Sequence, residues 1–358
     1  MQQSIFLSFC ISFLATVFIT PLVIRLMKTY RILDDPKTHK HPGIIHARPI
    51  PRGGGIALFF GVFLTSLLFL PLDRTTIGIF IAAFLSLLVG VYDDILNSQG
   101  KDLSPYIRFG TNIVSAIIVV ASGVSITFIT NPFGGILNLD TFTLSLPFLD
   151  IALSDIIAII WIVWLMNMLN WSKGVDGQMP GIVAISAIII GLLSLRVSGI
   201  EFAFLDAKLA FIIAGSAIGF LLYNFYPAKI FPGYGATSIY LLLAVASILS
   251  SAKLATAILV MGIPTVDALF TIFRRIASGK SPFWHDKKHL HHILLKLGLT
   301  QRQIALFYWI FSAILGTISL TLESKSKLFA MIMVIAITGG ALLFLHYFMR
   351  NSHDEKTV

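Results

Sequence analysis

The chain has 358 residues, of which 56% are hydrophobic and only 12% are charged. Soluble domains contain about 45–50% apolar and about 25% charged residues, so this composition excludes an ordinary water-soluble fold and a disordered chain. The net charge is +9, but in so apolar a chain surplus Lys and Arg is typical of cytoplasmic loops, and we expect no nucleic-acid partner. With a single cysteine, Cys10, the chain has no disulfide framework and no thiolate metal site. The composition therefore predicts a multi-span membrane protein.

Eleven stretches are long and apolar enough, or nearly so, to cross a bilayer as helices. A span needs about 20 residues, because each rises about 1.5 Å through a hydrocarbon core of about 30 Å. In chain order the stretches are Ser4–Met27, Gly54–Leu72, Thr75–Tyr92, Pro105–Phe128, Ile151–Asn170, Met179–Val197, Ala207–Phe225, Thr237–Ser251, Leu254–Phe273, Ile304–Leu322 and Leu328–Met349. We expect an all-α protein in which residues 1–358 form a single integral-membrane domain.

The basic residues predict the orientation of these segments. The first segment has no basic residue before its apolar run, whereas Arg25 and Lys28 follow it, so we expect an anchor rather than a signal peptide. With the N-terminus outside, most of the 26 Lys and Arg residues lie in inner segments, and the exceptions are Arg74, Arg196, Lys208, Lys253, Lys325 and Lys327. The positive-inside rule thus favours an outside N-terminus and a cytoplasmic C-terminus.

One outer connection is long, and the polar chemistry lies on the other side. Thr, Phe and Leu alternate between Ile129 and Asp150 around Gly134-Gly135, which predicts a small hairpin on the outer surface. Seven of the nine histidines lie in two inner loops, at positions 39, 41, 46, 285, 289, 291 and 292. We therefore expect a site at the cytoplasmic face.

The first inner loop carries His46 and Arg52, followed by Gly53-Gly54-Gly55. Glycines of this kind let the backbone approach a ligand closely or form a turn. A cationic anchor that fixes the topology explains the same loop equally well.

Two apolar segments carry carboxylates. Asp93 and Asp94 end the third segment, and ionisable groups at such a depth are functional candidates. Paired carboxylates bind hard cations or share one raised pKa, although a hydrated cap outside the membrane is the alternative. In the ninth segment Asp267 lies two turns from Arg274 and Arg275, a spacing that favours a local ion pair.

Further polar clusters follow the fifth and seventh segments. Asn167 and Asn170 are three residues apart and share one helix face, and Asp176 follows between two glycines. A polar helix terminus is the alternative explanation. Lys229 and the stretch 233–238 precede the eighth segment, where free amides at a helix start suit a phosphate but a plain helix cap explains them too.

The last large inner loop contains His289, His291 and His292. Such a group could bind a metal or a diphosphate. Because Lys and Arg dominate the loop and cysteine is absent from it, anionic oxygen ligands are favoured.

Taken together and in order, these motifs resemble the polyprenyl-phosphate N-acetylhexosamine-1-phosphate transferase family (glycosyltransferase family 4). The GlcNAc branch is more similar than the phospho-N-acetylmuramoyl-pentapeptide branch. The resemblance covers nearly the whole chain and rests on Asp34/Asp35-Pro36, His46–Gly54, Asp93-Asp94, Asn167–Gly177, Pro227–Phe231 and His289-x-His291-His292.

The resemblance implies transfer of a HexNAc-1-phosphate, most simply GlcNAc-1-phosphate, from a UDP-sugar to polyprenyl phosphate with release of UMP. It also implies a cell (inner) membrane location within the lipid bilayer, help from Mg²⁺ (or Mn²⁺), a role in cell-envelope glycan synthesis and, in many members, a homodimer. The catalytic candidates are Asp93, Asp94, Asp176 and His291, the first two also as weak metal ligands. The substrate-binding candidates are His46, Arg52, Asn167, Asn170, Lys173, Lys229, His289 and His292.

The chain departs from the family pattern at two acidic positions. Lys173 stands where the family has the first Asp of Asp-Gly-Leu-Asp-Gly, and Tyr234 stands where it has a principal magnesium ligand. A divalent ion would be held less tightly by this set. Two hypotheses follow: the Lys173 ammonium does part of the work of magnesium, or the chain is an impaired relative that binds lipid phosphate or nucleotide-sugar without transfer.

Overall fold

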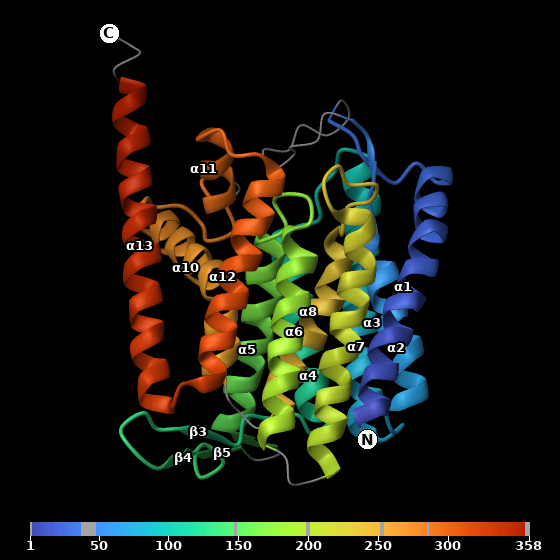
Figure 1. The fold of residues 1–358 in the computed structure, drawn as a ribbon, viewed down its shortest axis with the longest axis vertical. Coiled ribbons are helices and arrows are strands. Elements are labelled where there is room, and N and C mark those ends of the chain that lie inside the picture. The colour runs from blue at the N-terminus through green and yellow to red at the C-terminus, as the bar shows by residue number, and fades with distance from the viewer. Residues whose placement is uncertain are drawn as a thin grey trace.

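The computed structural model describes residues 2–36, 48–146, 149–197, 201–250, 254–284 and 286–354. Most of these residues are helical (Figure 1). The helices are α1 (Gln2–Thr29), α2 (Gly54–Phe69), α3 (Arg74–Ser98), α4 (Pro105–Ala121), α5 (Leu153–Trp171), α6 (Gln178–Val197), α7 (Glu201–Asn224), the 3₁₀ turn η1 (Tyr234–Ala236), α8 (Thr237–Leu249), α9 (Leu254–Val260), α10 (Gly262–Ala277), α11 (Leu290–Lys296), α12 (Gln301–Thr321) and α13 (Ser324–Asp354). The strands are β1 (Leu33–Asp34), β2 (Ile50–Pro51), β3 (Phe128–Thr130), β4 (Ile136–Asn138), β5 (Thr143–Leu146) and β6 (Leu149–Ala152).

Each apolar segment of the sequence overlaps a helix, which confirms a helical, multi-span architecture. Within the described ranges, seven helices are long and apolar enough to cross a membrane, or up to eight if a bent pair is one span. Helices α2 and α4 and the combined segment η1–α8 are also apolar, but they are shorter than these spans. Length and composition therefore support fewer spans than the predicted eleven.

The expectation of one continuous helix over Leu254–Phe273 is wrong. The segment is broken into α9 and α10, whose axes differ by 83°. Gly262 opens α10 and Pro264 follows in its first turn. Because proline has no backbone N–H and its ring clashes with the preceding turn, a helix kinks or restarts at such a position.

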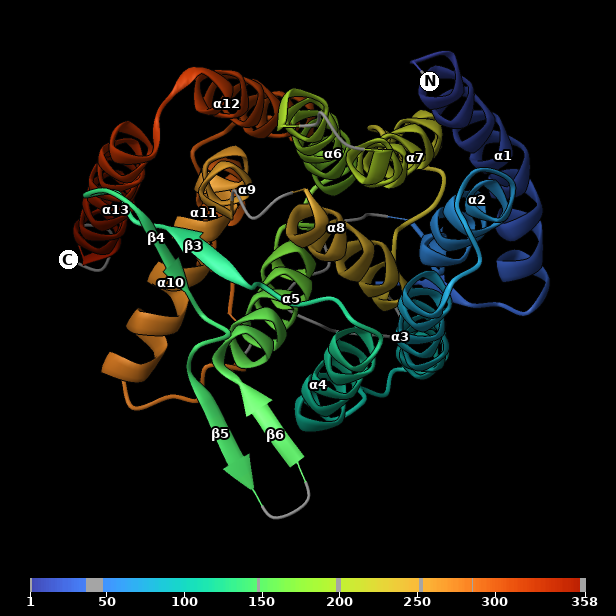
Figure 2. The ribbon, with the colours of Figure 1, turned by 90° about the horizontal axis from the view of Figure 1, so that it is seen from below.

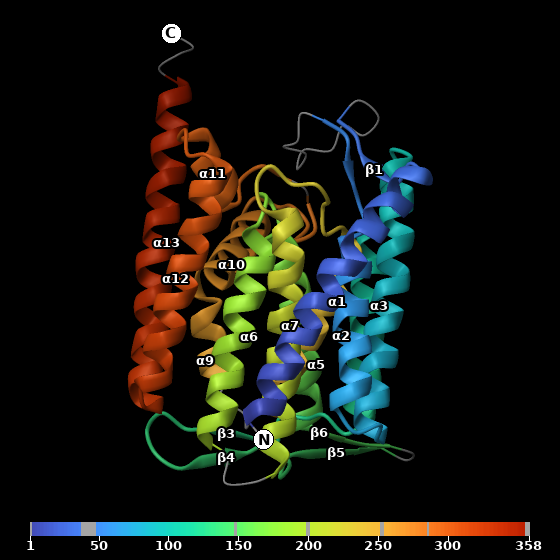
Figure 3. The same cartoon turned by 45° about the vertical axis from the view of Figure 1, so that its right-hand side comes forward.

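The two ends of the bundle differ. Helix α11 and the end of α13 lie at one end, whereas the start of α1 and strands β3–β6 lie at the other (Figures 1 and 3). The single hairpin expected between Ile129 and Asp150 is instead two antiparallel hairpins, β3–β4 and β5–β6. The alternating pattern continues past the first turn, where Gly134 and Gly135 have positive φ, into a second pair of strands.

Helix α8 forms the centre of the bundle, among α3, α5, α6 and α7 (Figure 2). Its residues from Ile239 to Ala246 are fully buried. A helix that is apolar all round is buried on all sides, which explains how so short a helix is accommodated. Its start therefore lies inside the protein, where it can position a site.

Glycines bring α2, α3 and the start of α8 into backbone contact. A Cβ added at Gly90 would lie 2.4 Å from the Gly235 Cα, and one at Gly55 would lie 2.1 Å from the Gly235 carbonyl carbon. Only residues without side chains allow this approach. The end of α3, with its two carboxylates, is thereby held against η1.

Candidate active site

The first inner loop pairs with the loop that precedes η1. The Phe231 N–H donates to the Pro51 carbonyl at 2.8 Å, and the amides of Gly54 and Gly55 donate to the carbonyls of Phe231 (3.0 Å) and Pro232 (2.8 Å). The glycine-rich stretch therefore approaches another part of the chain. These contacts fix Arg52 beside the end of α3.

Asp94 is the centre of the first polar cluster and is 1% exposed. Its Oδ1 accepts from Arg52 Nε and from the Tyr234 amide, both at 2.8 Å, and its Oδ2 accepts from the Gly235 amide at 3.4 Å. Arg52 also donates from Nη1 to Asp34 Oδ1 at 3.0 Å. The amides that were expected to suit a phosphate are thus bound by a carboxylate of the chain.

Asp93 has a different cation as its partner. Arg108 Nη2 lies 2.5 Å from Asp93 Oδ1, and the guanidinium lies 5.2 Å from the ring centroid of Tyr234. The Tyr234 hydroxyl accepts from Asn112 Nδ2 at 3.5 Å. Arg108 is in the first turns of α4 and was not predicted as a site residue. The sequence could have indicated Arg108 as a candidate, because it lies at the start of a helix near Asp102 and Pro105.

Lys173 completes this cluster from the loop after α5. Its Nζ donates to the Gly233 carbonyl at 2.8 Å and lies 5.6 Å from the Tyr234 ring centroid. Gly233 can present this carbonyl because its φ is +71°, a conformation that a side chain would strain. The two positions at which the chain departs from the family pattern are therefore neighbours in space.

Burial, followed by repulsion from Arg52, lowers the pKa of Lys173 to about 7, and Asp94 and Asp93 oppose this shift. A buried ammonium loses hydration, which disfavours its charged form. Near neutral pH this lysine can hold or release its proton. An anionic ligand would favour the protonated form.

The second cluster surrounds the N-terminus of α11. His289 Nδ1 lies 3.0 Å from Asp267 Oδ2 and 3.3 Å from Thr271 Oγ1. The Leu290 amide donates to Asp267 Oδ1 at 2.9 Å. Asp267 therefore orients one histidine and caps the helix that carries the next two.

The expectation of a local ion pair between Asp267 and the arginines of α10 is wrong. Arg274 Nη2 and Arg275 Nε donate to Asp286 Oδ2 at 3.0 and 3.2 Å. Although burial alone raises the pKa of Asp286, Arg275 and Arg274 lower it to about 2. The loop after α10 folds back, so that Asp286 takes these arginines and leaves Asp267 to His289.

His291 links the two clusters. A Cβ added at Gly174 would lie 1.9 Å from His291 Nε2, so its ring lies against the backbone next to Lys173. The His291 and His292 ring centroids are 4.3 Å apart. His291 Nδ1 is buried and has no hydrogen-bond partner in the part of the chain that the structure describes.

Burial, then the neighbouring imidazoles, holds the pKa of His291 well below its ordinary value. The same causes, burial and then His289, lower the pKa of His292 to about 4. Both rings are therefore neutral at pH 7. His291 can offer a ligand one hydrogen bond rather than a full charge.

Asp176 and Lys229 lie in the adjoining loops. Asp176 is 2% exposed, and its Oδ2 accepts from the Ala228 amide at 2.9 Å. This bond joins the loop after α5 to the loop after α7. Lys229 is exposed, with Nζ 5.9 Å from the Tyr223 ring centroid, and is not among the contacts of Asp94.

The two asparagines lie on the last turns of α5. Asn167 Nδ2 donates to the Val163 carbonyl of its own helix at 2.8 Å. Asn170 Oδ1 is buried without a partner among the described residues, which leaves it able to accept from a ligand. His46 lies outside the described residues.

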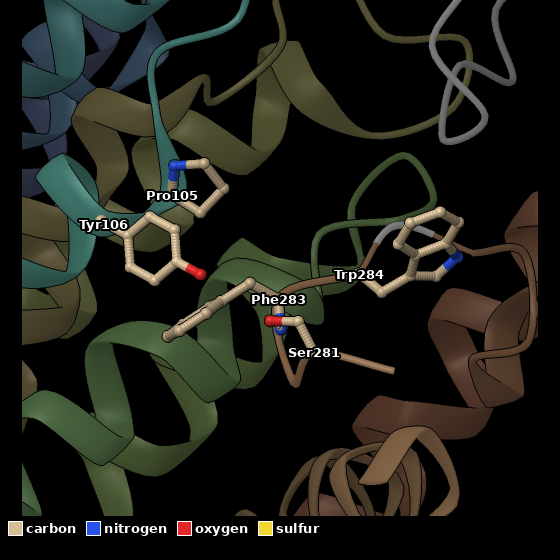
Figure 4. A pocket seen from close by; sticks show the side chains of 5 residues that line it. All are labelled: Pro105, Tyr106, Ser281, Phe283 and Trp284. Carbon is tan, nitrogen blue, oxygen red and sulfur yellow. Dashed lines mark hydrogen bonds between the residues drawn. The ribbon is translucent and has the colours of Figure 1, made fainter. Parts of the chain in front are cut away.

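An open groove of about 290 Å³ lies beside the first cluster (Figure 4). Its lining is Pro105, Tyr106, Ser281, Phe283 and Trp284. The Tyr106 and Phe283 rings meet edge to face at 5.9 Å, and Trp284 lies on the far side of Ser281. The groove is largely apolar, and its lining residues Pro105 and Tyr106 belong to the first turn of α4, which also carries Arg108.

A divalent metal does not fit this set of side chains. Mg²⁺ takes several oxygen ligands, with carboxylates among them. Across the described ranges, no group of three His, Cys, Asp or Glu residues could hold a metal ion. Asp93 and Asp94 are each bound by an arginine, and the Lys173 ammonium faces the same Tyr234 ring as Arg108. A divalent ion placed here would meet three cations.

Comparisons with known proteins agree with the geometry. The model of Glycosyl transferase family 4 matches residues 76–251. The undecaprenyl-phosphate alpha-N-acetylglucosaminyl 1-phosphate transferase of Haemophilus influenzae is 30% identical over 329 residues, covering 88% of this chain and 85% of that protein. The probable undecaprenyl-phosphate N-acetylglucosaminyl 1-phosphate transferase of Bacillus subtilis is 29% identical, covering 90% and 86%. The decaprenyl-phosphate N-acetylglucosaminephosphotransferase of Mycolicibacterium smegmatis is also 29% identical, covering 87% and 81%. The chain belongs to glycosyl transferase family 4, which confirms the resemblance drawn from its motifs.

Proposed function

We propose that this protein transfers GlcNAc-1-phosphate from UDP-GlcNAc to a polyprenyl phosphate and releases UMP, as a step of cell-envelope glycan synthesis. The observation that carries the proposal is the meeting of Arg52, Arg108 and Lys173 at one end of an apolar bundle, in a chain whose relatives are named for this transfer. The names of these relatives give no support to the alternative of binding without transfer.

The site suits a reaction between two anions. An oxygen of the lipid phosphate attacks the β-phosphorus of the nucleotide-sugar, the bond from that phosphorus to the bridging oxygen breaks, and UMP leaves with the electron pair. Fixed positive groups aimed at the phosphates lower the barrier, because they offset their mutual repulsion without reorganising. The three cations supply such groups.

The two substrates approach from different sides. The apolar groove next to Arg108 suits the prenyl chain, with its phosphate toward that guanidinium. The loop of Lys173, the His291 ring and the unpartnered Asn170 carbonyl suit the polar donor. Asp93 and Asp94 hold the arginines in place and are candidates to orient or deprotonate the lipid phosphate. We also propose that the nucleotide-sugar is contacted by six further residues, namely Asn167, Asp176, Lys229, His289, His292 and His46.

The membrane arrangement is part of the proposal. Eleven crossings, with α9 and α10 as one bent span, would place the N-terminus outside and the C-terminus in the cytoplasm. The start of α1 and the end of α13 lie at opposite ends of the bundle, which supports an odd number of crossings (Figure 1). The protein then lies in the cell (inner) membrane, and its active site faces the cytoplasm, which contains the nucleotide-sugars. We also propose a homodimer, for which the mass of the purified protein in nanodiscs should be twice that of one chain.

The experiment is a transfer assay with the purified full-length chain in nanodiscs that contain undecaprenyl phosphate. With UDP-[¹⁴C]GlcNAc, label should pass into the organic phase as UMP is released in equal amount. Asp93→Asn should abolish this. Asp73→Asn is the matched control, because Asp73 caps the opposite end of the same helix and asparagine caps as well. Absence of labelled lipid with the unmodified chain would contradict the proposal.

A further inference from the structure

We propose that this protein transfers the sugar phosphate without a divalent cation, and that Lys173 is the cation that meets the phosphates in its place. The inference rests on the proposed transferase function and adds the cofactor requirement of that site.

The first support is the use of the charges in the site. Asp94 and Asp34 share Arg52, and Asp93 has Arg108. A metal bound by Asp93 and Asp94 would have to displace these arginines from carboxylates that are each 1% exposed. Breaking such buried pairs would leave the guanidinium groups as uncompensated charges, which is costly. The carboxylates therefore serve to hold two guanidinium groups.

The second support is the position of Lys173. Its Nζ bonds a backbone carbonyl, that of Gly233, and no ion pair with a carboxylate is found for it among the described residues. An ammonium has three N–H donors, so two remain for oxygens of a ligand. Asp94 and Asp93 are near enough to influence it, but unlike the two arginines Lys173 forms no ion pair with a carboxylate in the part of the chain that the structure describes.

The third support is the ring of Tyr234. It lies 5.2 Å from the Arg108 guanidinium and 5.6 Å from Lys173 Nζ. Cations are attracted to the face of an aromatic ring, and a tyrosine contributes no ligand charge for a metal. The ring thus holds two cations at the place where the family pattern has an acidic residue.

The reaction balances without a metal. The dianionic lipid phosphate and the dianionic UDP-GlcNAc give a dianionic lipid diphosphate and dianionic UMP, with one P–O bond made and one broken. Once the lipid phosphate is a dianion, no further proton needs to enter or leave. The fixed cations face four negative charges at the beginning and at the end.

The test compares turnover and metal binding in nanodiscs. With excess EDTA, the unmodified chain should transfer GlcNAc-1-phosphate within about twofold of its rate with Mg²⁺, and Mn²⁺ should give no bound signal by electron paramagnetic resonance. Lys173→Met should lower turnover about 100- to 1,000-fold, the usual cost of losing one transition-state contact, and Mg²⁺ should not restore it. Lys296→Met, on an exposed lysine at the end of α11, is the matched control and should leave turnover unchanged.

The converse variant restores acids at both positions. Lys173→Asp combined with Tyr234→Asp should bind Mn²⁺ and should need a metal for any turnover it shows. If EDTA abolishes turnover of the unmodified chain and Mg²⁺ restores it, the inference is overturned and the transferase function stands. If no metal condition gives turnover, the transferase function itself fails.

Discussion

The ammonium of Lys173 should make donor use depend on pH in a defined way. The pKa of this lysine is lowered to about 7, mainly by burial and then by Arg52. The charged and titratable groups that face it are Arg52, Arg108, Asp93, Asp94 and Tyr234. Because the ammonium attracts a phosphate and the neutral amine does not, kcat/KM for UDP-GlcNAc should fall as pH rises through 7.

The size of the effect follows from the charge. A unit charge pair at about 4 Å contributes about 4 kcal/mol at an effective dielectric constant of 20, which corresponds to about 1,000-fold in rate. The amine form should therefore contribute little, and kcat/KM should follow the protonated fraction. At pH 9, two units above a pKa of about 7, kcat/KM should be about 100-fold below its plateau at low pH.

The assay is a pair of pH–rate profiles, for the unmodified chain and for Lys173→Arg. An arginine stays charged over this range, so its alkaline limb should be absent whatever its absolute rate. The Kd for UDP-GlcNAc, measured by calorimetry over the same pH range, should show the same difference between the two proteins. An identical alkaline limb in both would refute the assignment of this titration to Lys173.

Three further substitutions test other parts of the site. Arg108→Lys keeps the charge but loses the planar fork, so KM for polyprenyl phosphate should rise about tenfold in a lipid titration while the donor Kd stays constant; an equal loss of donor affinity would contradict this. Gly174→Ala places a Cβ 1.9 Å from His291 Nε2, whereas Gly339→Ala meets open space; the first should lower kcat/KM at least about tenfold by displacing the ring, and equal activity of the two variants would argue against it. Asp267→Asn removes the charge that faces its histidine partner, so it should lower the stability by about 1–3 kcal/mol and Tm by several degrees in a thermal melt; an unchanged Tm would remove it as an anchor of α11.

The sequence predicts the helices because their signal is local. Each apolar run overlaps a helix, and most of the polar residues singled out from the sequence lie near a helix end. The bend in the ninth segment had a local signal as well, in Gly262 and Pro264, which hydrophobicity alone conceals. The second hairpin, β5–β6, was not predicted because a single alternating pattern runs through both hairpins and does not show where the first one ends.

The partners within the site could not be predicted, because they are set by contacts between distant segments. Arg52 meets Asp94 across 42 residues, and Asp94 meets the Tyr234 amide across 140. Local spacing pairs Asp267 with arginines two turns away, whereas the returning loop gives it to His289. The sequence showed that two acids were missing, but only the fold shows Lys173 and Tyr234 side by side.

The most direct test follows the β-phosphate of the donor. With UDP-[β-³²P]GlcNAc and polyprenyl phosphate in nanodiscs, the proposed reaction moves the label into the lipid and leaves unlabelled UMP. Label that stays in the nucleotide, as UDP, while sugar enters the lipid would show transfer of the sugar alone and would contradict phosphosugar transfer.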